Sequence, residues 1–380
     1  MITAPFAGLE TPCLLLDRAR LDRNAERMRA RCVSLGVNLR PHLKTAKSVD
    51  VARVASGGGV GSITVSTLAE AAYFAAAGWR DILYATAIAP AKVPRAALIQ
   101  RETGARLTLV VDNVEAVRAA ADAAAKNGAS FGCLVEIDCG EHRSGVAPAS
   151  NELLAVAEAI AAAAPHLALA GVMTHAGHSY AFDDPAAVRA LAEIERAAAV
   201  VSADRLRAAG HDFLTVSVGS TPTVLFAEHL QGVSEVRAGI YLFWDLSQLS
   251  RRVCAEDDIA VSVLATVISH QKGGPSVVLD AGALALSKDI GANRYMPDAQ
   301  YGWVCDPVTG RRLGTLSVSV VHQEHGTVPI PDESWFARLP VGSQVRILPN
   351  HACLTCAAYS AYEVIVDGRI AERWERTGGW

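Results

Sequence analysis

Several features that mark other classes of protein are missing from this 380-residue sequence. Hydrophobic residues make up 51% of it, yet no uninterrupted apolar run approaches the roughly 18 residues that a membrane-spanning helix needs. The N-terminal segment MITAPFAGLETPCLLLD has no basic start followed by an apolar stretch and a small-residue cleavage site, so we expect no secretory signal. We therefore expect a soluble, cytoplasmic protein without a membrane partner.

Charge and cysteine patterns exclude further classes. The net charge of -4 comes without a basic block or a stripe of aromatic and arginine residues, which argues against nucleic acid as a partner and favours a small molecule. The 8 cysteines follow no disulfide-scaffold spacing, and in a reducing compartment most of them should be small buried hydrophobic residues. Only Cys353 and Cys356, in PNHACLTC, suggest more.

Two patterns divide the chain. Up to about residue 250, Ala-rich segments with helical spacing alternate with short segments that are apolar on both faces, and Gly36, Gly78 and Gly128 end three of the helical segments. This alternation predicts a parallel sheet covered by helices, with a (β/α)8 barrel as the expected form and a doubly wound sheet as the alternative. Beyond it, β-branched runs separated by turns predict a mainly β domain. We place the barrel at residues 16–248 and the β domain at residues 249–380 together with residues 1–15.

The candidate chemistry of the first domain begins in LRPHLKTAKS (39–48), where Lys44 follows a predicted strand. Functional groups of parallel α/β folds gather at the carboxyl ends of strands, so Lys44 is a candidate amine nucleophile, with a plain solvated turn as the alternative. Arg143 follows the strand FGCLVEID in the same way. The turn from Gly219 to Thr221, with Gly239 on a later strand, is a candidate anion site, and an ordinary helix N-cap is the alternative.

A His-x-Cys pair, His351 and Cys353, is the candidate metal site of the second domain. On an extended strand, residues i and i+2 point the same way, so the imidazole and the thiolate would reach one ion, whereas a buried packing pair is the ordinary alternative. The sequence has no second ligand pair with suitable spacing, so we expect positions left open for water or substrate. A thiolate ligand favours zinc over magnesium.

Two motifs resemble those of a known family. RPHLKTAKS resembles the lysine motif of the D-serine dehydratase and D-threonine aldolase group, fold-type III pyridoxal 5'-phosphate (PLP) enzymes related to alanine racemase, and EIDCGEHRSGV resembles a barrel strand of the same group. The resemblance runs along nearly the whole chain, and within the group it is greatest to the D-threo-3-hydroxyaspartate dehydratases. Ala46 departs from the histidine that many relatives have there. The resemblance implies an alanine racemase-like PLP barrel, a second, mainly β domain and a homodimer.

The same resemblance assigns roles to residues. It implies that Lys44 holds the cofactor and acts as the base at Cα, and that His351 and Cys353 bind a catalytic divalent ion such as zinc, manganese, cobalt or nickel. The likeness to alanine racemase implies that Arg237 faces the pyridine nitrogen of the cofactor, with a structural salt bridge as the alternative role. We expect a lyase that dehydrates a D-configured β-hydroxy amino acid, D-threo-3-hydroxyaspartate or D-serine, to a 2-oxo acid and ammonia. The residues expected around PLP are Lys44, Arg143, Tyr180, Ser220, Thr221, Arg237, Gly239, Ile240 and Tyr241.

Three other functions stay open at this point. An aldolase on the same scaffold would break the Cα–Cβ bond, and Cys353 in place of the aspartate of D-threonine aldolases argues against it. A non-catalytic PLP-binding protein would resemble the barrel but lack the β domain. A racemase would need a second base on the other face of the cofactor, for which Tyr295, Tyr301 and Tyr359 are candidates.

Overall fold

The structure, a computed structural model, describes residues 5–380 and divides the chain into two compact units. The first, which we call the barrel unit, runs from Glu26 to Gly239 and includes Thr377–Trp380. The second, the β unit, joins the chain up to Ala25 to Ile240–Arg376. The domain boundary expected at residues 248 and 249 stays a prediction.

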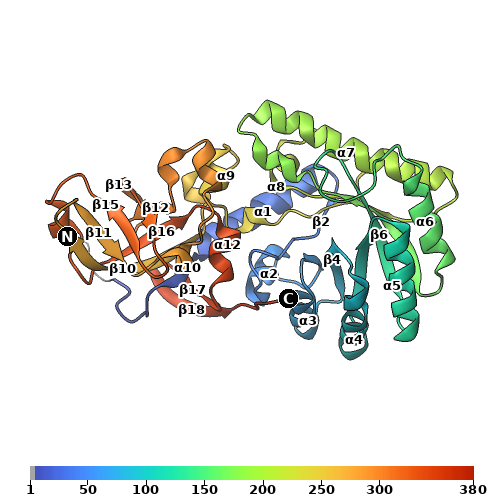
Figure 1. The fold of residues 1–380 in the computed structure, drawn as a ribbon, viewed down its shortest axis with the longest axis horizontal. Helices are drawn as coiled ribbons and strands as arrows, with labels where there is room; N and C mark the ends of the chain where they lie inside the picture. The colour runs from blue at the N-terminus through green and yellow to red at the C-terminus, as the bar shows by residue number, and fades with distance from the viewer. Residues whose placement is uncertain (1–4) are drawn as a thin grey trace. The chain divides into compact units, whose positions relative to one another are not determined.

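The barrel unit is built on a curled parallel sheet (Figure 1), and the segment after its first strand meets its last strand in a single bridge. At the junction, His42 and Thr64 form a parallel bridge in which the Leu43 amide donates to the Thr64 carbonyl and the Thr64 amide donates to the Pro41 carbonyl, each at 2.9 Å. This closure confirms the alanine racemase-like barrel. In sheet order the strands are β2 (Asn38–Leu39), β9 (Glu235–Val236), β8 (Thr215–Val218), β7 (Leu167–Thr174), β6 (Phe131–Ile137), β5 (Arg106–Val111), β4 (Asp81–Ala87) and β3 (Ser62–Val65).

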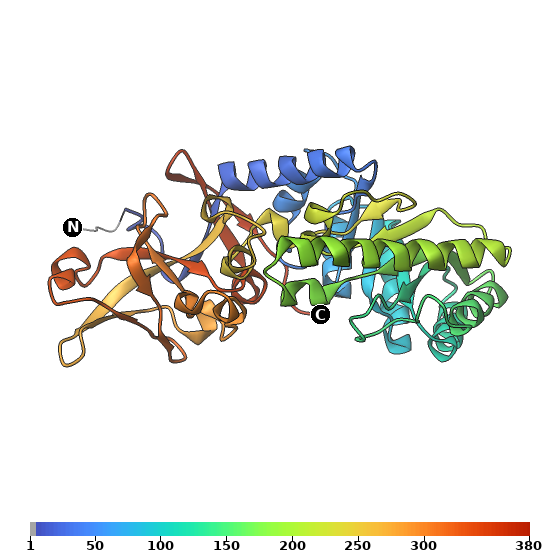
Figure 2. The same cartoon turned by 90° about the horizontal axis from the view of Figure 1, so that it is seen from above.

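Helices connect these strands and pack on the outside of the sheet, with the long α7 along one side (Figure 2). Thr67 and Asn113 cap α3 and α5, each accepting a backbone amide of the first turn. Gly36, Gly78 and Gly128 adopt positive φ after helix ends, as the sequence predicts. The helices are α1 (Arg18–Ser34), which begins in the β unit, α2 (Val49–Ala55), α3 (Leu68–Ala76), α4 (Val93–Thr103), α5 (Val114–Lys126), α6 (Glu152–Ala162), α7 (Pro185–Ala208) and α8 (Thr221–Phe226).

The β unit confirms the expected mainly β domain. Its N-terminal strand β1 pairs antiparallel with β10 and parallel with β17, so a segment from the start of the chain lies inside a sheet made from its end. The strands are β1 (Cys13–Asp17), β10 (Val261–Gln271), β11 (Ser276–Leu279), β12 (Gly302–Cys305), β13 (Arg312–Ser317), β14 (Val320–Val321), β15 (Gly326–Pro329), β16 (Gln344–Pro349), β17 (Ala361–Val366) and β18 (Arg369–Glu375). The short helices are α9 (Leu246–Ser250), α10 (Ala283–Leu286), α11 (Trp335–Arg338) and α12 (Ala352–Ala357).

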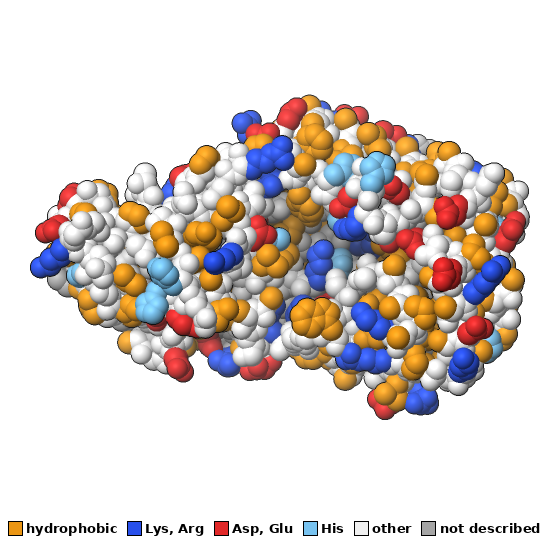
Figure 3. Space-filling view, in the orientation of Figure 1, with side chains coloured by type: hydrophobic (Ala, Val, Ile, Leu, Met, Phe, Trp, Pro, Cys, Tyr) orange, Lys and Arg blue, Asp and Glu red, His pale blue; other side chains and the backbone are white. Residues whose placement is uncertain are grey.

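Charged side chains of both signs are intermixed on the face drawn in Figure 3. Within residues 5–380, no helix combines the length and the apolar character that crossing a membrane requires.

A buried ion network stabilises the junction of the barrel. The Arg40 side chain follows β2 and is only 12% exposed; its Nε lies 2.9 Å from Glu235 Oε2 on β9, and its Nη1 lies 3.1 Å from Asp81 Oδ1 on β4. Glu235 and Asp81 raise the pKa of Arg40 against the opposing effect of burial. Arg40 therefore ties strands on both sides of the junction.

We predict that Arg40→Met destabilises the barrel unit by about 3 kcal/mol, because it leaves the Glu235 carboxylate buried without its partner. Arg53→Met is the matched control, since Arg53 pairs with Asp50 at an exposed position. Loss of such a pair lowers the free energy of unfolding by about 0.5 kcal/mol. Urea unfolding followed by circular dichroism compares the two variants. Equal stability of both variants would show that the network contributes nothing to closure.

Candidate active site

A cavity of about 390 Å³ opens inside the barrel unit and contains the amine that the sequence singled out. Its lining comes from the junction segment after β2 and from the carboxyl ends of strands β3, β4, β6, β7, β8 and β9, so the side chains gather where parallel barrels place their chemistry. The lining residues are His42, Lys44, Ser66, Ala85, Thr86, Ala87, Glu136, Arg143, Ser144, Met173, His175, Gly219 and Arg237.

Lys44 differs from the other cations of LRPHLKTAKS. Arg40 is held by its two carboxylates, and Lys47 Nζ lies 3.2 Å from Glu70 Oε1, a side chain that is 1% exposed. Lys44 is exposed to the cavity, and no carboxylate of residues 5–380 lies within ion-pair distance of its amine. The parallel bridge at His42 fixes the backbone two residues before it. The segment therefore presents one unpaired amine, exposed in a turn whose backbone is fixed by the bridge at His42, and its role as a nucleophile stays a prediction.

Two histidines flank this amine in their neutral form. Burial lowers the pKa of His42 and of His175 well below the usual range, and Lys44 and Arg237 lower both further. His175 follows β7, and its Nδ1 hydrogen-bonds to the Gly219 carbonyl in the loop after β8. With both imidazoles neutral, the cationic side chains of the cavity are Lys44, Arg143 and Arg237. An anionic ligand can therefore bind these cations without protonation of either histidine.

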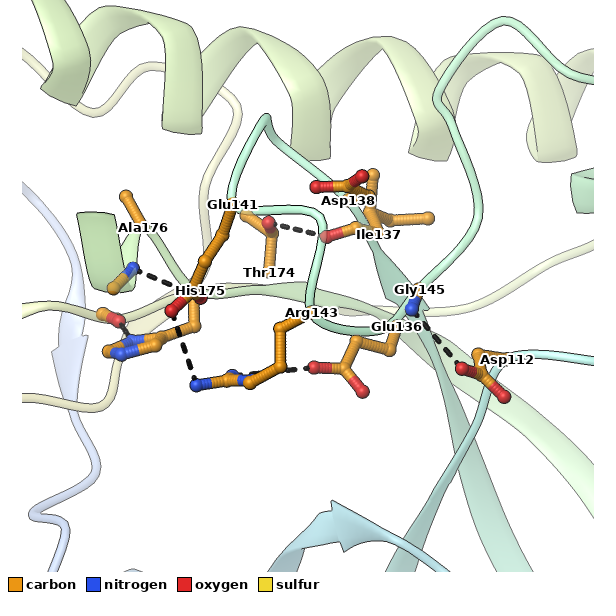
Figure 4. Close-up of polar contacts among 12 residues, drawn as sticks. Asp112, Glu136, Ile137, Asp138, Glu141, Arg143, Gly145, Thr174, His175 and Ala176 are labelled. Atoms are coloured by element: carbon orange, nitrogen blue, oxygen red, sulfur yellow. Dashed lines mark hydrogen bonds and ion pairs between the residues drawn. The ribbon is translucent and has the colours of Figure 1, made fainter. Parts of the chain in front are cut away.

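Arg143 reaches the cavity from the loop after β6 (Figure 4). Its Nη2 lies 3.8 Å from Glu136 Oε1 and its Nη1 lies 3.5 Å from Glu141 Oε1, while 56% of the side chain is exposed. Burial raises the pKa of Glu136, and Ser144 and Arg143 oppose that shift. The guanidinium thus has two weak carboxylate contacts and free donors that a ligand would accept.

Arg237 lies beneath the cavity and is 5% exposed. Its Nη1 donates to Ser217 Oγ at 2.5 Å and its Nη2 donates to the Thr174 carbonyl at 2.6 Å. No carboxylate among residues 5–380 forms an ion pair with it, so the structural salt bridge considered as an alternative is absent there. Burial lowers the pKa of Arg237, and Glu235, Glu195 and Glu136 limit the shift.

The Gly219 to Thr221 turn does not form an ordinary side-chain cap. Ser220 stands at the N-cap of α8 without capping it, and its Oγ lies 2.7 Å from Ser179 Oγ instead. Thr221 Oγ1 accepts the Gly239 amide at 3.3 Å. A Cβ on Gly239 would lie 2.5 Å from the His42 carbonyl, so glycine is required for strand contact beside the lysine segment.

The remaining expected cofactor residues are dispersed. Tyr180 is half-buried in a short 3-10 helix, Gly177–Ala181, and is not part of the cavity lining among the residues described. Ile240 and Tyr241 are buried in a second 3-10 helix, Ile240–Leu242, which starts the β unit. Their roles in cofactor binding stay predictions.

His351 and Cys353 lie together at the start of α12, and not on one extended strand as the sequence suggested. Strand β16 ends at Pro349; His351 is the extended N-cap, and its carbonyl accepts the Thr355 amide, which turns the chain into the helix that carries Cys353. Burial lowers the pKa of His351, but hydrogen bonds to Asp289 and Cys353 outweigh burial and raise it to about 11. Imidazole and thiol are therefore adjacent despite the helical turn.

Two carboxylates and a side-chain amide form hydrogen bonds around His351 and Cys353. Asp289 Oδ2 lies 2.7 Å from His351 Nδ1, which leaves Nε2 for another partner. Asp245, fully buried, accepts the amides of Ala352 and Gln248 at 2.9 Å, so it caps α12 and α9 together. Asn350 donates to Asn293 Oδ1 and accepts the Ala292 amide.

A nitrogen and a sulfur donor on rigid backbone suit a borderline-soft divalent ion. No set of three or more His, Cys, Asp or Glu side chains within residues 5–380 is arranged to hold a metal, so the pair would leave coordination positions open. Asp245 and Asp289 were missed by sequence reasoning: Asp245 could have been read as the N-cap of DLSQLS, whereas nothing in SKDIG links Asp289 to His351.

Two family models match the chain in succession. The alanine racemase N-terminal domain matches residues 16–247, and a putative serine dehydratase domain matches residues 260–365. Among relatives, D-threo-3-hydroxyaspartate dehydratase from Delftia sp. (strain HT23) is 46% identical over 98% of each chain, and D-serine dehydratase from Dictyostelium discoideum is 33% identical over 98% of each chain. The 3-hydroxy-D-aspartate aldolase of Paracoccus denitrificans (strain Pd 1222) is 32% identical over 96% of this chain and 91% of the relative.

Solved structures agree with these matches. D-threo-3-hydroxyaspartate dehydratase from Delftia sp. HT23 superposes with a TM-score of 0.94 at 45% identity over 100% of both chains. Alanine racemase from Clostridium difficile 630 superposes with a TM-score of 0.70 at 14% identity, over 96% of this chain and 98% of the racemase, which is a likeness of fold alone. The resemblance expected from the lysine and arginine motifs is confirmed.

The neutral histidines predict a pH dependence of stability with a definite sign. An unfolded histidine has a pKa near 6.5, and the folded values of His42 and His175 are lower, so below about pH 6.5 the unfolded chain binds more protons. Their contribution to stability is complete above that pH and falls by about 1.4 kcal/mol per pH unit per histidine below it. Substituting His175→Gln should flatten the fall of the thermal unfolding midpoint between about pH 6.5 and 5.5. A slope equal to that of the wild type would mean that His175 protonates normally in the folded protein.

Proposed function

Since the chain belongs to the family that joins an alanine racemase-type barrel to a serine dehydratase domain, we propose that it is a PLP- and divalent-metal-dependent dehydratase. Its substrate is a D-configured β-hydroxy amino acid, D-threo-3-hydroxyaspartate or D-serine, and its products are a 2-oxo acid and ammonia. The observation that carries the proposal is the Lys44 amine, unpaired and exposed in the barrel cavity that Arg143 and Arg237 also line.

The residues of the cavity fit PLP. The amine of Lys44 suits covalent attachment of an aldehyde, and the spare donors of Arg143 suit a phenolate oxygen. Beside them, the first turn of α8 has no side-chain cap, and Gly239 keeps the backbone close to the lysine segment. Arg237 supplies a buried positive charge, held in place by Ser217 and Thr174.

Bound PLP supplies a sink for the electrons left when the Cα–H bond breaks. Lys44 Nζ takes the Cα proton, and the neutral state of His42 and His175 keeps competing acids away from it. Arg237, fixed through two hydrogen bonds, keeps its proton and holds positive charge beneath the cavity. The β-hydroxyl then takes up a proton and leaves as water, and water afterwards hydrolyses the dehydrated amino acid, which gives the 2-oxo acid and ammonia.

His351 Nε2 and Cys353 Sγ would hold the divalent ion, which supplies Lewis acidity toward the leaving hydroxyl. The thiolate favours zinc, with manganese, cobalt and nickel as further candidates. A cysteine-to-alanine variant of D-threo-3-hydroxyaspartate dehydratase has been solved in a metal-free form, which supports a metal requirement in this chain. A cytoplasmic homodimer, as the family resemblance implies, is part of the proposal.

Aldol cleavage is the second candidate, because an aldolase also stands among the full-length relatives. Cleavage needs a base for the β-hydroxyl proton, whereas dehydration needs that oxygen made a better leaving group. The Cys353 thiolate, a ligand that suits a Lewis-acidic ion, favours dehydration.

We expect the protein, supplied with PLP and zinc or manganese, to release keto acid and ammonia from D-threo-3-hydroxyaspartate or D-serine. EDTA should abolish the release, and His351→Ala should lower the rate by at least about 100-fold, since it removes a ligand outright. Cys254→Ser, at another half-buried cysteine, is the control and should leave the rate unchanged. Glycine plus an aldehyde would establish the aldolase instead, and no turnover of any of these substrates would rule out both.

Asp289 should tune the metal site through His351. Asp289→Asn weakens the charge-assisted hydrogen bond to Nδ1, and we expect metal affinity to fall by about 10- to 100-fold. Chelator competition with zinc measures the affinity directly. Asp332→Asn, an exposed carboxylate in a turn, serves as the control. An unchanged affinity in Asp289→Asn would contradict the orienting role.

A further inference from the structure

A carboxylic side chain is buried behind the cavity, in the middle of helix α7. Glu195 is 2% exposed, and no lysine, arginine or histidine among residues 5–380 forms an ion pair with it. Burial raises its pKa, and the hydrogen bonds from Thr223 and the Ala176 amide, together with the charge of Arg237, oppose the shift. Carboxylates are almost never buried without a partner, so Glu195 needs a reason to be there.

The partners of Glu195 come from two separate loops. Its Oε1 accepts the Ala176 amide at 2.8 Å, in the loop after β7, and the Gly219 amide at 3.3 Å, in the loop after β8. Its Oε2 lies 2.5 Å from Thr223 Oγ1 in α8, and that hydroxyl also lies 3.0 Å from the Ser220 carbonyl. One side chain therefore joins the loop after β7 to the loop after β8 and to the first turn of α8.

Each of these loops carries part of the cavity. His175 precedes Ala176 (Figure 4) and lines the cavity with Gly219. The two loops also touch where His175 Nδ1 meets the Gly219 carbonyl. Ser220 and Ser179 join the same loops through their hydroxyls. Without Glu195, the amides of Ala176 and Gly219 would be buried without an acceptor, and the spacing of the loops would lose its support.

We propose that Glu195 is a positioning residue that sets the spacing of the loops after β7 and β8 and so shapes the cradle for the phosphate of PLP. The inference rests on the proposed function for the identity of the ligand. Glu195 acts through hydrogen-bond geometry. One of its oxygens accepts the amides of Ala176 and Gly219, and the other is the hydrogen-bond partner of the Thr223 hydroxyl.

Glutamine can reproduce this geometry. In Glu195→Gln, Oε1 accepts both amides, and Nε2 donates to Thr223 Oγ1, which then donates to the Ser220 carbonyl. Alanine reproduces none of it. Glu193, two residues earlier on α7, is exposed and pairs with Arg196 at 2.6 Å, so Glu193→Ala is the control on the same helix.

Hydrogen exchange in the cofactor-free protein tests whether Glu195 holds the loops after β7 and β8 together. In Glu195→Ala, exchange should accelerate at least about tenfold in the segments 175–179 and 217–224, while Glu195→Gln and Glu193→Ala stay within about threefold of the wild type. Thr223→Val, a milder change, should accelerate exchange in 217–224 alone, and it keeps the test decisive where the alanine variant fails to fold. Unchanged exchange near Gly219 in both Glu195→Ala and Thr223→Val would overturn the inference.

Titration with PLP tests the consequence. Glu195→Ala should raise the Kd for PLP at least about tenfold, and Glu195→Gln should keep it within about threefold. An unchanged Kd in Glu195→Ala would show that Glu195 has a structural role only. If Glu195→Gln raised the Kd as much as Glu195→Ala does, the charge of the carboxylate, and not its hydrogen-bond geometry, would be what PLP binding requires. Wild-type protein that fails to bind PLP would refute the proposed function separately, because the exchange result does not depend on the cofactor.

Discussion

A continuous chain of buried polar contacts links the closure of the barrel to the floor of the cavity. Arg40 Nε binds Glu235 Oε2 at 2.9 Å, Ser217 Oγ donates to Glu235 Oε1 at 2.8 Å, and Arg237 Nη1 donates to Ser217 Oγ at 2.5 Å. Barrel interiors are ordinarily filled by branched apolar side chains, and a buried polar chain is stable only when its members satisfy one another. The contacts that close the sheet at the lysine segment thus also fix the arginine beneath the expected cofactor.

In the β unit, too, buried polar groups satisfy one another, here around the proposed metal ligands. His351 and Cys353 sit where a strand ends and a helix begins, a place with backbone groups that need partners. Asp245 caps the helix, and Asp289 turns the imidazole. A donor pair held this firmly loses little entropy on binding an ion, which suits the metal site proposed for His351 and Cys353.

The sequence predicted what local pattern controls. The alternation of helices and strands predicted the barrel, and the glycines predicted where helices end. The position of Lys44 after a strand made it the candidate amine. It did not predict contacts between distant strands: Arg237 meets Thr174 across 63 positions, and His351 meets Asp289 across 62. Glu195 reads as an ordinary helix residue in AEIERAAAVV, because periodicity does not reveal which polar side chain two loops will bury.

The central claim is that Lys44, and no other lysine, carries PLP. Reduction of the PLP-loaded protein with borohydride, followed by peptide mass spectrometry, tests it most directly. We predict a pyridoxyl adduct on Lys44 and none on Lys47, whose amine is paired with buried Glu70. An adduct on Lys47, on any lysine outside the cavity, or on none would contradict the account.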